Sequence, residues 1–209
     1  PDGAQIELSL ADDQSRLSVV AGRSSFALPC LPQEDFPVLA EDNLPASFQI
    51  AADELKRLID KSRFAISTEE TRYYLNGIYL HAAEADGVPM LRAVATDGHR
   101  LAQVDCPLPD GAASMPGVIV PRKAVLEVRR LLDQVDEPVQ VSLSETKIRF
   151  AFGKTVLTTK LIDGTFPDYQ RVIPSGNDKI LEVDCKQFAD AVDRVSTIST
   201  EKSRSIKLS

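Results

Sequence analysis

An internal repeat constrains this sequence more than any other feature, because copies of one sequence unit are expected to fold as copies of one structure. Two alternating apolar residues, Phe48 and Ile50, precede apolar residues at helical spacing, which predicts a short strand leading into a helix. The same order returns from Val118 and from Leu181, so the three units begin about 63 to 70 residues apart. Their apolar helix positions are Leu55, Leu58 and Ile59; Val125 and Val128; and Phe188, Ala191 and Val192.

A second repeat has about twice this period. Residues 4–23 and 139–154 each alternate, turn, alternate again and reach a glycine followed by a basic residue, which predicts a β-hairpin in both places. Each hairpin precedes another strand, at residues 25–28 and 155–161, and then a Phe-Pro pair. The copies lie about 130 residues apart, so one domain should consist of two half-units with antiparallel strands and one helix each.

The repeats predict an α+β fold in three domain segments. Residues 1–43 are the C-terminal part of a first domain, residues 44–174 are a complete second domain, and residues 175–209 are the N-terminal part of a third. Because the chain lacks an initiator Met and opens close to a strand, we expect an upstream portion to be missing.

Two helices are predicted inside the complete domain, over Asp53 to Arg63 and over Arg122 to Asp133, among about eight short strands. The Pro-containing stretches at residues 37–45 and 174–178 should act as linkers. A domain of this size can bury a core without a disulfide or a metal.

Composition and patterning exclude several classes of protein. The 209 residues are 43% hydrophobic and 26% charged, which is typical of a soluble globular protein and excludes disorder and collagen. No stretch approaches the roughly 18 apolar residues of a membrane helix, and the first residues do not resemble a signal peptide. We therefore expect a cytoplasmic protein without a membrane partner.

The cysteine and charge counts narrow the possible classes of protein further. Cys30, Cys106 and Cys185 are scattered without a CxxC pair, and only His81 and His99 could join them, so neither a disulfide framework nor a metal site is expected. The net charge of −7 argues against a uniformly basic nucleic-acid binder, although it allows a basic face on an acidic body.

The segment from Arg72 to Gly77, RYYLNG, is expected to enter a strand. On composition alone, an ordinary strand start with two aromatic residues is the favoured interpretation. The alternative is an exposed Arg and Tyr pair that touches a phosphate backbone, which the neighbouring Glu69 and Glu70 would oppose.

The segment from Thr96 to Leu101 holds the dipeptide Asp97-Gly98, a strong signal for a tight turn between strands. An alternative, catalytic interpretation makes the protein a hydrolase with His99 as base and Asp97 as its orienting partner. Residues two apart seldom pair in this way, and the sequence has neither a nucleophile motif nor a phosphate-binding glycine loop.

Pro121 is expected in the first turn of the second helix, where its missing N–H has no cost. The helical period places Lys123 and Arg130 opposite the apolar stripe and Arg122 toward its edge. This face is either simply solvated or turned toward a polyanion.

Taken together and in order, four motifs resemble the family of bacterial replicative sliding clamps, the beta subunit of DNA polymerase III. They are RYYLNG, VATDGHRLA, VIVPRK and KLIDGTFPDYQRVIP, and GRSSFALPCLPQEDFP is similar to the end of the family's first domain. The resemblance implies the DNA-clamp fold, with three repeated domains per chain and two chains in a head-to-tail ring. Sheets would lie outside and helices would line the hole.

The resemblance also implies a role as a non-catalytic processivity factor without a cofactor. Its partners would be encircled double-stranded DNA, the clamp loader, and DNA polymerase III and other clamp-binding proteins, which dock short peptides in a groove. The full-length protein would be a homodimer, whereas this 209-residue chain alone would be a monomer.

By matching motifs, the resemblance assigns two sets of site residues. The peptide-binding groove would be lined by Leu75, Thr96, Gly98, His99, Arg100, Leu101, Pro167, Arg171 and Val172. The DNA-facing positions would be Arg72, Tyr73, Tyr74, Arg122 and Lys123. The alternatives to this function are a β-rich protein-interaction module unrelated to replication and, with less support, the hydrolase centred on His99 and Asp97.

Overall fold

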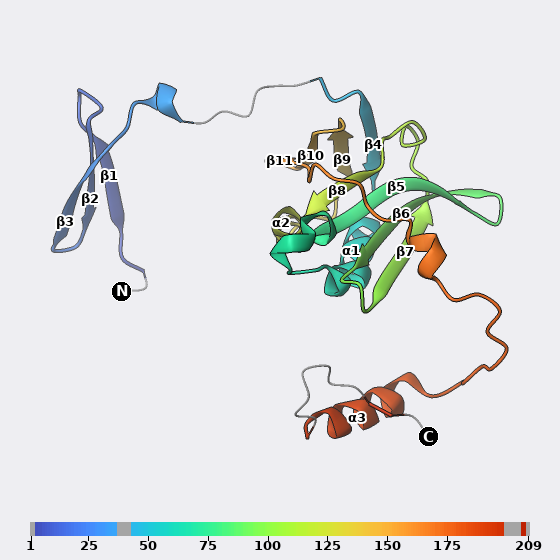
Figure 1. Cartoon of the computed structure of the whole chain (residues 1–209). Helices are drawn as coiled ribbons and strands as arrows, with labels where there is room; N and C mark the ends of the chain where they lie inside the picture. The colour runs from blue at the N-terminus through green and yellow to red at the C-terminus, as the bar shows by residue number, and fades with distance from the viewer. Residues whose placement is uncertain (1–2, 37–42, 199–205, 208–209) are drawn as a thin grey trace. The chain divides into compact units, whose positions relative to one another are not determined.

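The computed structural model describes residues 3–36, 43–198 and 206–207. The chain divides into two compact units, Pro1–Phe166 and Pro167–Ser209. Figure 1 shows a small sheet near the N-terminus, a larger region of strands and helices in the middle, and one helix near the C-terminus. Within the described residues, no helix has the length and apolar character needed to cross a membrane.

The N-terminal sheet is an antiparallel meander of three strands, which confirms the hairpin predicted for these residues. Strand β1 (Ile6–Leu10) pairs with β2 (Arg16–Ala21), and β2 pairs with β3 (Ser24–Pro29). Gly22 in the second turn has a φ of +61°, a left-handed conformation that favours glycine. A single turn of 3-10 helix, η1 (Gln33–Asp35), follows the sheet.

The central region repeats the order of strand, helix and hairpin, as predicted. Its first half contains β4 (Ala46–Ile50), α1 (Ala52–Ser62), η2 (Arg63–Ala65), η3 (Glu70–Leu75), β5 (Gly77–Ala85), β6 (Val88–Thr96) and β7 (Leu101–Pro107). Its second half contains β8 (Val118–Pro121), α2 (Arg122–Leu132), β9 (Val139–Leu143), β10 (Lys147–Phe152) and β11 (Thr155–Lys160). Both helices end one residue earlier than predicted.

The first strand of each half of the central region pairs with the sheet of the other half. One sheet has the order β7-β6-β5-β8, and the other has the order β11-β10-β9-β4. Strand β8 therefore extends the hairpins of the first half, while β4 pairs antiparallel with β9 of the second half. The sequence repeat predicts the strands but does not reveal this exchange, because a period of two residues does not specify the partner of a strand.

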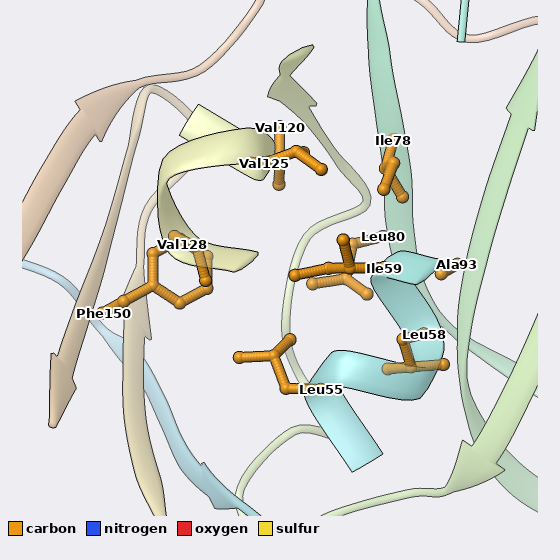
Figure 2. A pocket seen from close by; sticks show the side chains of 10 residues that line it. All are labelled: Leu55, Leu58, Ile59, Ile78, Leu80, Ala93, Val120, Val125, Val128 and Phe150. Carbon is orange, nitrogen blue, oxygen red and sulfur yellow. The ribbon is translucent and has the colours of Figure 1, made fainter. Parts of the chain in front are cut away.

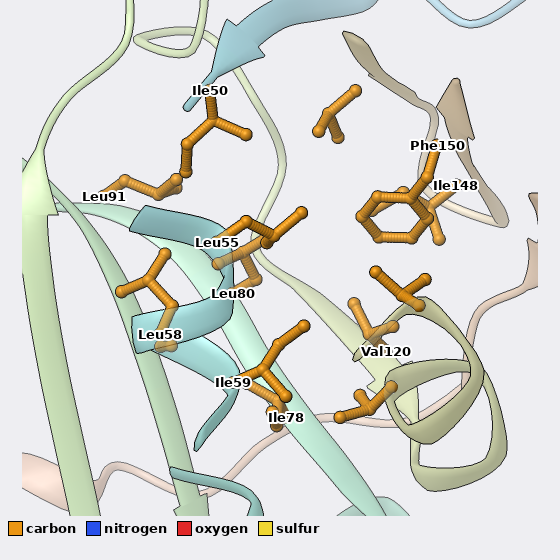
Figure 3. Packing of buried hydrophobic residues seen from close by; sticks show 14 of the residues in the cluster. Ile50, Leu55, Leu58, Ile59, Ile78, Leu80, Leu91, Val120, Ile148 and Phe150 are labelled. Atoms are coloured by element: carbon orange, nitrogen blue, oxygen red, sulfur yellow. The ribbon is translucent and has the colours of Figure 1, made fainter. Parts of the chain in front are cut away.

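Helices α1 and α2 contact each other and bury their apolar faces against the sheets (Figure 3). Leu55, Leu58 and Ile59 of α1 are buried, as are Val125 and Val128 of α2, so the apolar stripes predicted for these two helices do form the core. The third predicted stripe, on α3 (Cys185–Ser196), has no buried residue. Alternate residues of the strands complete this core, among them Ile78, Leu80, Leu91, Val120, Ile148 and Phe150.

A cavity of about 30 Å³ remains between these side chains (Figure 2). Its lining is entirely apolar, from Leu55 on α1 to Phe150 on β10. A water molecule there would find no hydrogen-bonding partner, so we assign the cavity to core packing and not to ligand binding.

The opposite face of the β7-β6-β5-β8 sheet is covered as well. Val94 and Ile119 are buried although they point away from the helices, and Ile162 donates a backbone hydrogen bond of 3.0 Å to Ile119. The ring of Tyr79 stacks on Phe166, with 4.9 Å between the ring centroids. The segment after β11 therefore packs along this face and covers part of the sheet from outside.

One local prediction is wrong: residues 72–75 belong to the 3-10 segment η3, which is kinked at Arg72, and do not start a strand. Two contacts favour the tighter turn. Asn76 closes it by donating its backbone N–H to the Tyr73 carbonyl at 3.0 Å, and its side chain donates to the Glu69 carbonyl at 3.1 Å. Strand β5 then begins at Gly77, where an added Cβ would come within 2.3 Å of the Val120 carbonyl oxygen.

The C-terminal unit contains η4 (Tyr169–Val172) and α3 (Cys185–Ser196) in its described residues. Asp184 caps α3 by accepting a hydrogen bond of 2.8 Å from the backbone of Gln187, as expected for an acidic residue at a helix start. The strand predicted at Leu181 to Val183 is absent, because no described segment pairs with these residues. Of the predicted linkers, residues 174–178 have no regular structure, and most of residues 37–45 lie outside the described residues.

Candidate functional site

The turn between β6 and β7 is built around the carboxylate of Asp97. This carboxylate accepts hydrogen bonds of 3.0 Å from the backbone N–H groups of His99 and Arg100, and it pairs with the Arg100 guanidinium at 3.0 Å. Burial raises the pKa of Asp97, but the two backbone donors and Arg100 outweigh that effect and lower it overall. Gly98 has a φ of +87°, so the predicted tight turn is confirmed.

The arrangement of this turn argues against the hydrolase alternative. Asp97 binds the backbone of His99 and not the imidazole ring, so the pair does not have the geometry of an oriented catalytic base. In the part of the chain that the structure describes, no group of three or more His, Cys, Asp and Glu residues is placed to hold a metal ion.

Arg72 is held on the neighbouring 3-10 helix by Glu69. Two nitrogens of the guanidinium donate to the two carboxylate oxygens at 2.8 and 2.6 Å. This bidentate pair lowers the pKa of Glu69 and raises that of Arg72. The sequence suggested that Glu69 would oppose a phosphate contact by Arg72. In the structure, the Glu69 carboxylate already accepts hydrogen bonds from two nitrogens of the Arg72 guanidinium.

Arg72 also lies against the turn at Gly98. A Cβ at position 98 would come within 2.6 Å of Nη1 of Arg72. Arg72, expected to face DNA, and Gly98, expected to line the groove, are therefore direct neighbours. The two predicted sets of residues meet at this point.

A hollow of about 380 Å³ lies beside this contact and also combines the two sets. It is lined by Arg63, Phe64, Ile66, Ser67, Thr68, Glu69, Asp97, His99, Arg100 and Arg122. His99 and Arg100 belong to the predicted groove, whereas Arg122 belongs to the predicted DNA-facing set. No sequence motif points to the segment 63–68, where a basic and an aromatic residue directly after a helix are the only signals.

The other predicted groove residues differ in their exposure. Thr96 and Leu101 are directly opposite each other at the ends of β6 and β7, and both are partly exposed. Leu75 is only 4% exposed, so it is part of the packed interior in this structure.

Pro167, Arg171 and Val172 belong to the second compact unit. Arg171 forms an ion pair of 2.7 Å with Asp168, and Val172 is largely exposed. Whether these three residues complete one groove with His99 and Leu101 stays a prediction.

The remaining predicted DNA-facing residues lie in η3 and at the start of α2. Tyr73 and Tyr74 pack edge to face, with ring centroids 5.7 Å apart, and Tyr73 is half exposed. Arg122 and Lys123 occupy the first two positions of α2, and both are exposed.

The basic residues of α2 differ in their ion pairs. Arg129 pairs with Asp60 and Asp133, and Arg130 pairs with Glu127 at 2.9 Å. Among the residues that the structure describes, no carboxylate pairs with Arg122 or Lys123. On α2, the positive charge available to an external anion therefore lies at the N-terminal end of the helix.

Comparison with known proteins gives the same family for both compact units. The family model of the DNA polymerase III beta subunit central domain matches residues 49–168, and the model of its C-terminal domain matches residues 170–209. The beta sliding clamp of Caulobacter vibrioides is 58% identical over 208 residues, and that of Escherichia coli K12 is 42% identical over 210 residues. These alignments cover all of this chain but only 56% and 55% of the two relatives.

Solved structures agree with this result. A crystal structure of the Caulobacter crescentus beta sliding clamp superposes with a TM-score of 0.90 at 58% identity, covering 97% of this chain and 54% of that one. A Bartonella birtlesii sliding clamp bound to griselimycin has a TM-score of 0.87 at 56% identity, with 97% and 54% covered. The chain thus spans about half the length of its relatives. The central-domain model matches more than half of this chain, so the chain belongs to the DNA polymerase III beta subunit family, the bacterial sliding clamps.

Proposed function

We propose that the protein acts as a sliding clamp, a processivity factor that encircles duplex DNA and tethers replication proteins to it. In this proposal two full-length chains form a closed ring, loaded by a clamp loader in the cytoplasm. The protein itself catalyses no reaction and needs no cofactor. The domain bounds at residues 1–43, 44–174 and 175–209 belong to the same proposal.

One observation supports this function independently of the family match. Of the basic residues on α2, only Arg122 and Lys123 have no carboxylate partner among the described residues, although the whole chain has a net charge of −7. A clamp that slides needs a few phosphate contacts that do not read sequence, and an acidic remainder keeps DNA away from other surfaces. Because Arg129 and Arg130 are already paired, DNA contact on α2 would fall to Arg122 and Lys123.

The second part of the proposal is the peptide groove. We infer that His99, Arg100 and Leu101, with Thr96 and Gly98 beside them, form one wall, and that Leu75, Pro167, Arg171 and Val172 complete it. Apolar side chains surrounded by polar edges suit a short peptide that carries spaced apolar residues. DNA polymerase III and other clamp-binding proteins would dock there.

DNA binding tests the first part of the proposal. Replacing both Arg122 and Lys123 with Gln in the full-length chain should weaken binding to two unrelated duplexes equally, and should reduce the slope of log affinity against log salt by about 2. Fluorescence anisotropy at several salt concentrations measures both quantities.

Arg130→Gln is the matched control, because it removes a charge from the same helix that Glu127 already neutralises. It should leave the affinity and the salt slope nearly unchanged. A loss in the double variant that depends on DNA sequence, or no loss at low salt, would contradict the DNA-facing assignment.

A further inference from the structure

The β11-β10-β9-β4 sheet carries positive charge in an otherwise acidic chain. Residues 139–160, which form three of its four strands, contain four basic residues and one acidic residue, Glu145. The fourth strand, β4, contains no charged residue. Because the whole chain has a net charge of −7, the charge of this sheet is opposite in sign to that of the remainder.

The register of the strands places most of this charge on one face. Alternate residues of β10 are buried in the core, namely Ile148, Phe150 and Phe152. The residues between them therefore point to the face away from the helices. There Lys147 is directly opposite Lys160 of β11, and Arg149, two residues further along β10, is opposite Thr158. Three basic side chains thus lie in two adjacent rows of one face.

The charges of Arg149 and Lys160 are available to an external anion. Both side chains are exposed, and no carboxylate in the described part of the chain pairs with either of them. The polar side chains beside them on the same face hydrogen bond to one another. Ser47 and Ser142 share a hydrogen bond of 2.8 Å, and Gln140 donates to Ser47 at 2.8 Å. The cations therefore dominate the chemistry of this face.

The spacing of the rows indicates the shape of the anion. Residues two apart on a strand are about 7 Å apart, which is also the repeat of side chains on one side of an extended peptide. Acidic residues at alternate positions of such a peptide would meet first Lys147 and Lys160 and then Arg149. The next row of the face holds Ala151 opposite Val156, whose side chain is 54% exposed. An apolar residue at the next alternate position of the peptide would contact it.

A nucleic acid suits this face less well. Single strands bind where bases stack on aromatic side chains, and the residues of these four strands that point away from the helices include no aromatic one. A duplex carries phosphates along both of its strands. Glu137 and Glu145, which flank β9, are both exposed and would repel these phosphates. A narrow extended peptide can follow the cationic rows without reaching either carboxylate.

We propose that the basic sheet face, defined by Lys147, Arg149, Val156 and Lys160, binds an extended acidic segment of a partner protein. The segment carries acidic residues at two alternate positions and an apolar residue at the next alternate position. This inference goes beyond the proposed function, because it requires neither the peptide groove nor the encircled DNA. It also shares no residue with either of those sites.

Two labelled peptides of the same composition test this proposal in the full-length chain. The probe has Glu at two alternate positions, Leu at the next alternate position, and Ser and Thr elsewhere. In the second peptide the second Glu is moved by one residue, so that it points to the other side of the extended chain. Fluorescence anisotropy at low salt should show that the probe binds about fivefold more tightly, as expected for one additional exposed ion pair.

Arg149→Gln should reduce this ratio to about 1, because it removes the cation that the second Glu meets. Lys154→Gln is the matched control. It removes an equally exposed charge from the same hairpin, but Lys154 lies in the β10–β11 turn and outside the cationic rows. It should leave the ratio unchanged. Both variants should keep the unfolding temperature of the unaltered chain in circular dichroism, since both side chains are exposed.

The other outcomes would overturn the proposal. Equal binding of the two peptides, or binding of neither, would exclude an extended acidic segment as the ligand. An equal loss in Arg149→Gln and Lys154→Gln would mean that the probe responds only to overall charge. Displacement of the probe by an uncharged peptide with spaced apolar residues would place it in the groove, and would leave the proposed function intact. Displacement by a short duplex in the unaltered chain but not in Arg149→Gln would assign the face to phosphate.

Discussion

Two regions of this molecule share one sequence pattern but differ in burial. Strands β1 and β2 read IELSL and RLSVVA, and strands β9 and β10 read VQVSL and KIRFAF. Their registers are the same, because Leu10 is opposite Leu17 just as Leu143 is opposite Ile148. Yet Leu10 is 53% exposed, whereas Leu143 is fully buried.

The difference comes from what covers each sheet. In the central region β4 extends the sheet, and the apolar faces of α1 and α2 cover it. The described part of the chain provides no helix against the apolar face of β1 to β3. Alternation of apolar and polar residues therefore determines that a strand forms, while burial depends on elements elsewhere in the chain.

Thiol reactivity should show this contrast most strongly. Burial raises the pKa of the Cys106 thiol on β7 to about 11, whereas Cys30 after β3 is partly exposed and Cys185 is exposed. At pH 8 we expect a thiol reagent to modify Cys30 and Cys185 at least about a hundredfold faster than Cys106. Mass spectrometry of timed samples measures the three rates.

In denaturant all three thiols should react together, which serves as the control. Similar rates in the folded protein would mean that the central region opens as readily as the N-terminal sheet. The raised pKa of Cys106 also affects stability. The protonated thiol makes its full contribution to the free energy of unfolding below the ordinary thiol pKa of 9.0, and this contribution is lost as the pH rises toward about 11.

Matched truncations should show the next largest effect. Leu143→Ala removes a fully buried side chain, so it should lower the free energy of unfolding by about 3 kcal/mol. Leu10→Ala, at the equivalent position of β1, should cost less than about 1 kcal/mol because its side chain is half exposed. Urea unfolding followed by circular dichroism compares the two, and equal costs would show that another element covers β1 in solution.

Replacing the turn glycines with alanine should have the smallest effect on stability, and this effect should be similar in the two regions. Gly22 and Gly153 have φ values of +61° and +53°, and an added Cβ would meet no atom within 4 Å at either position. Alanine at each should therefore cost about 1 kcal/mol of backbone strain and nothing for steric contact. Amide hydrogen exchange of the adjacent strands measures the change locally.

Asparagine provides the control for the glycine variants, because it tolerates the left-handed conformation better than alanine. Gly22→Asn and Gly153→Asn should recover part of the loss. A much larger cost at Gly153 would indicate packing around that turn which the structure does not show.

The sequence predicts most of the fold where local patterns decide the structure. The helix stripes at Leu58 and Val128 and both hairpins follow from spacing alone. The 3-10 helix at Glu70–Leu75 does not, because its turn depends on hydrogen bonds between residues up to seven positions apart, such as that from Asn76 to Glu69. A spacing of three between Glu69 and Arg72 is the one local signal for such a turn.

The site is less predictable than the fold. The family resemblance selected His99, Arg100 and Arg122, but it assigned them to separate surfaces. The structure places them around one hollow, because α2 begins close to the β6–β7 turn. That proximity arises from the pairing of β8 with β5, a contact between segments about 40 residues apart that no short motif encodes.

The strand exchange between the two halves has a kinetic consequence. Neither half can complete its own sheet, since β4 pairs with β9 across about 90 residues and β8 pairs with β5. Closing such long loops before any contact is gained makes folding slow relative to a helical protein of the same size. A protease cut between β7 and β8 would leave two pieces. The first would contain β4, which belongs to the sheet of β9 to β11, and the second would contain β8, which belongs to the sheet of β5 to β7. Such pieces should stay associated after cleavage, and fragments made separately should recover the fold only when mixed.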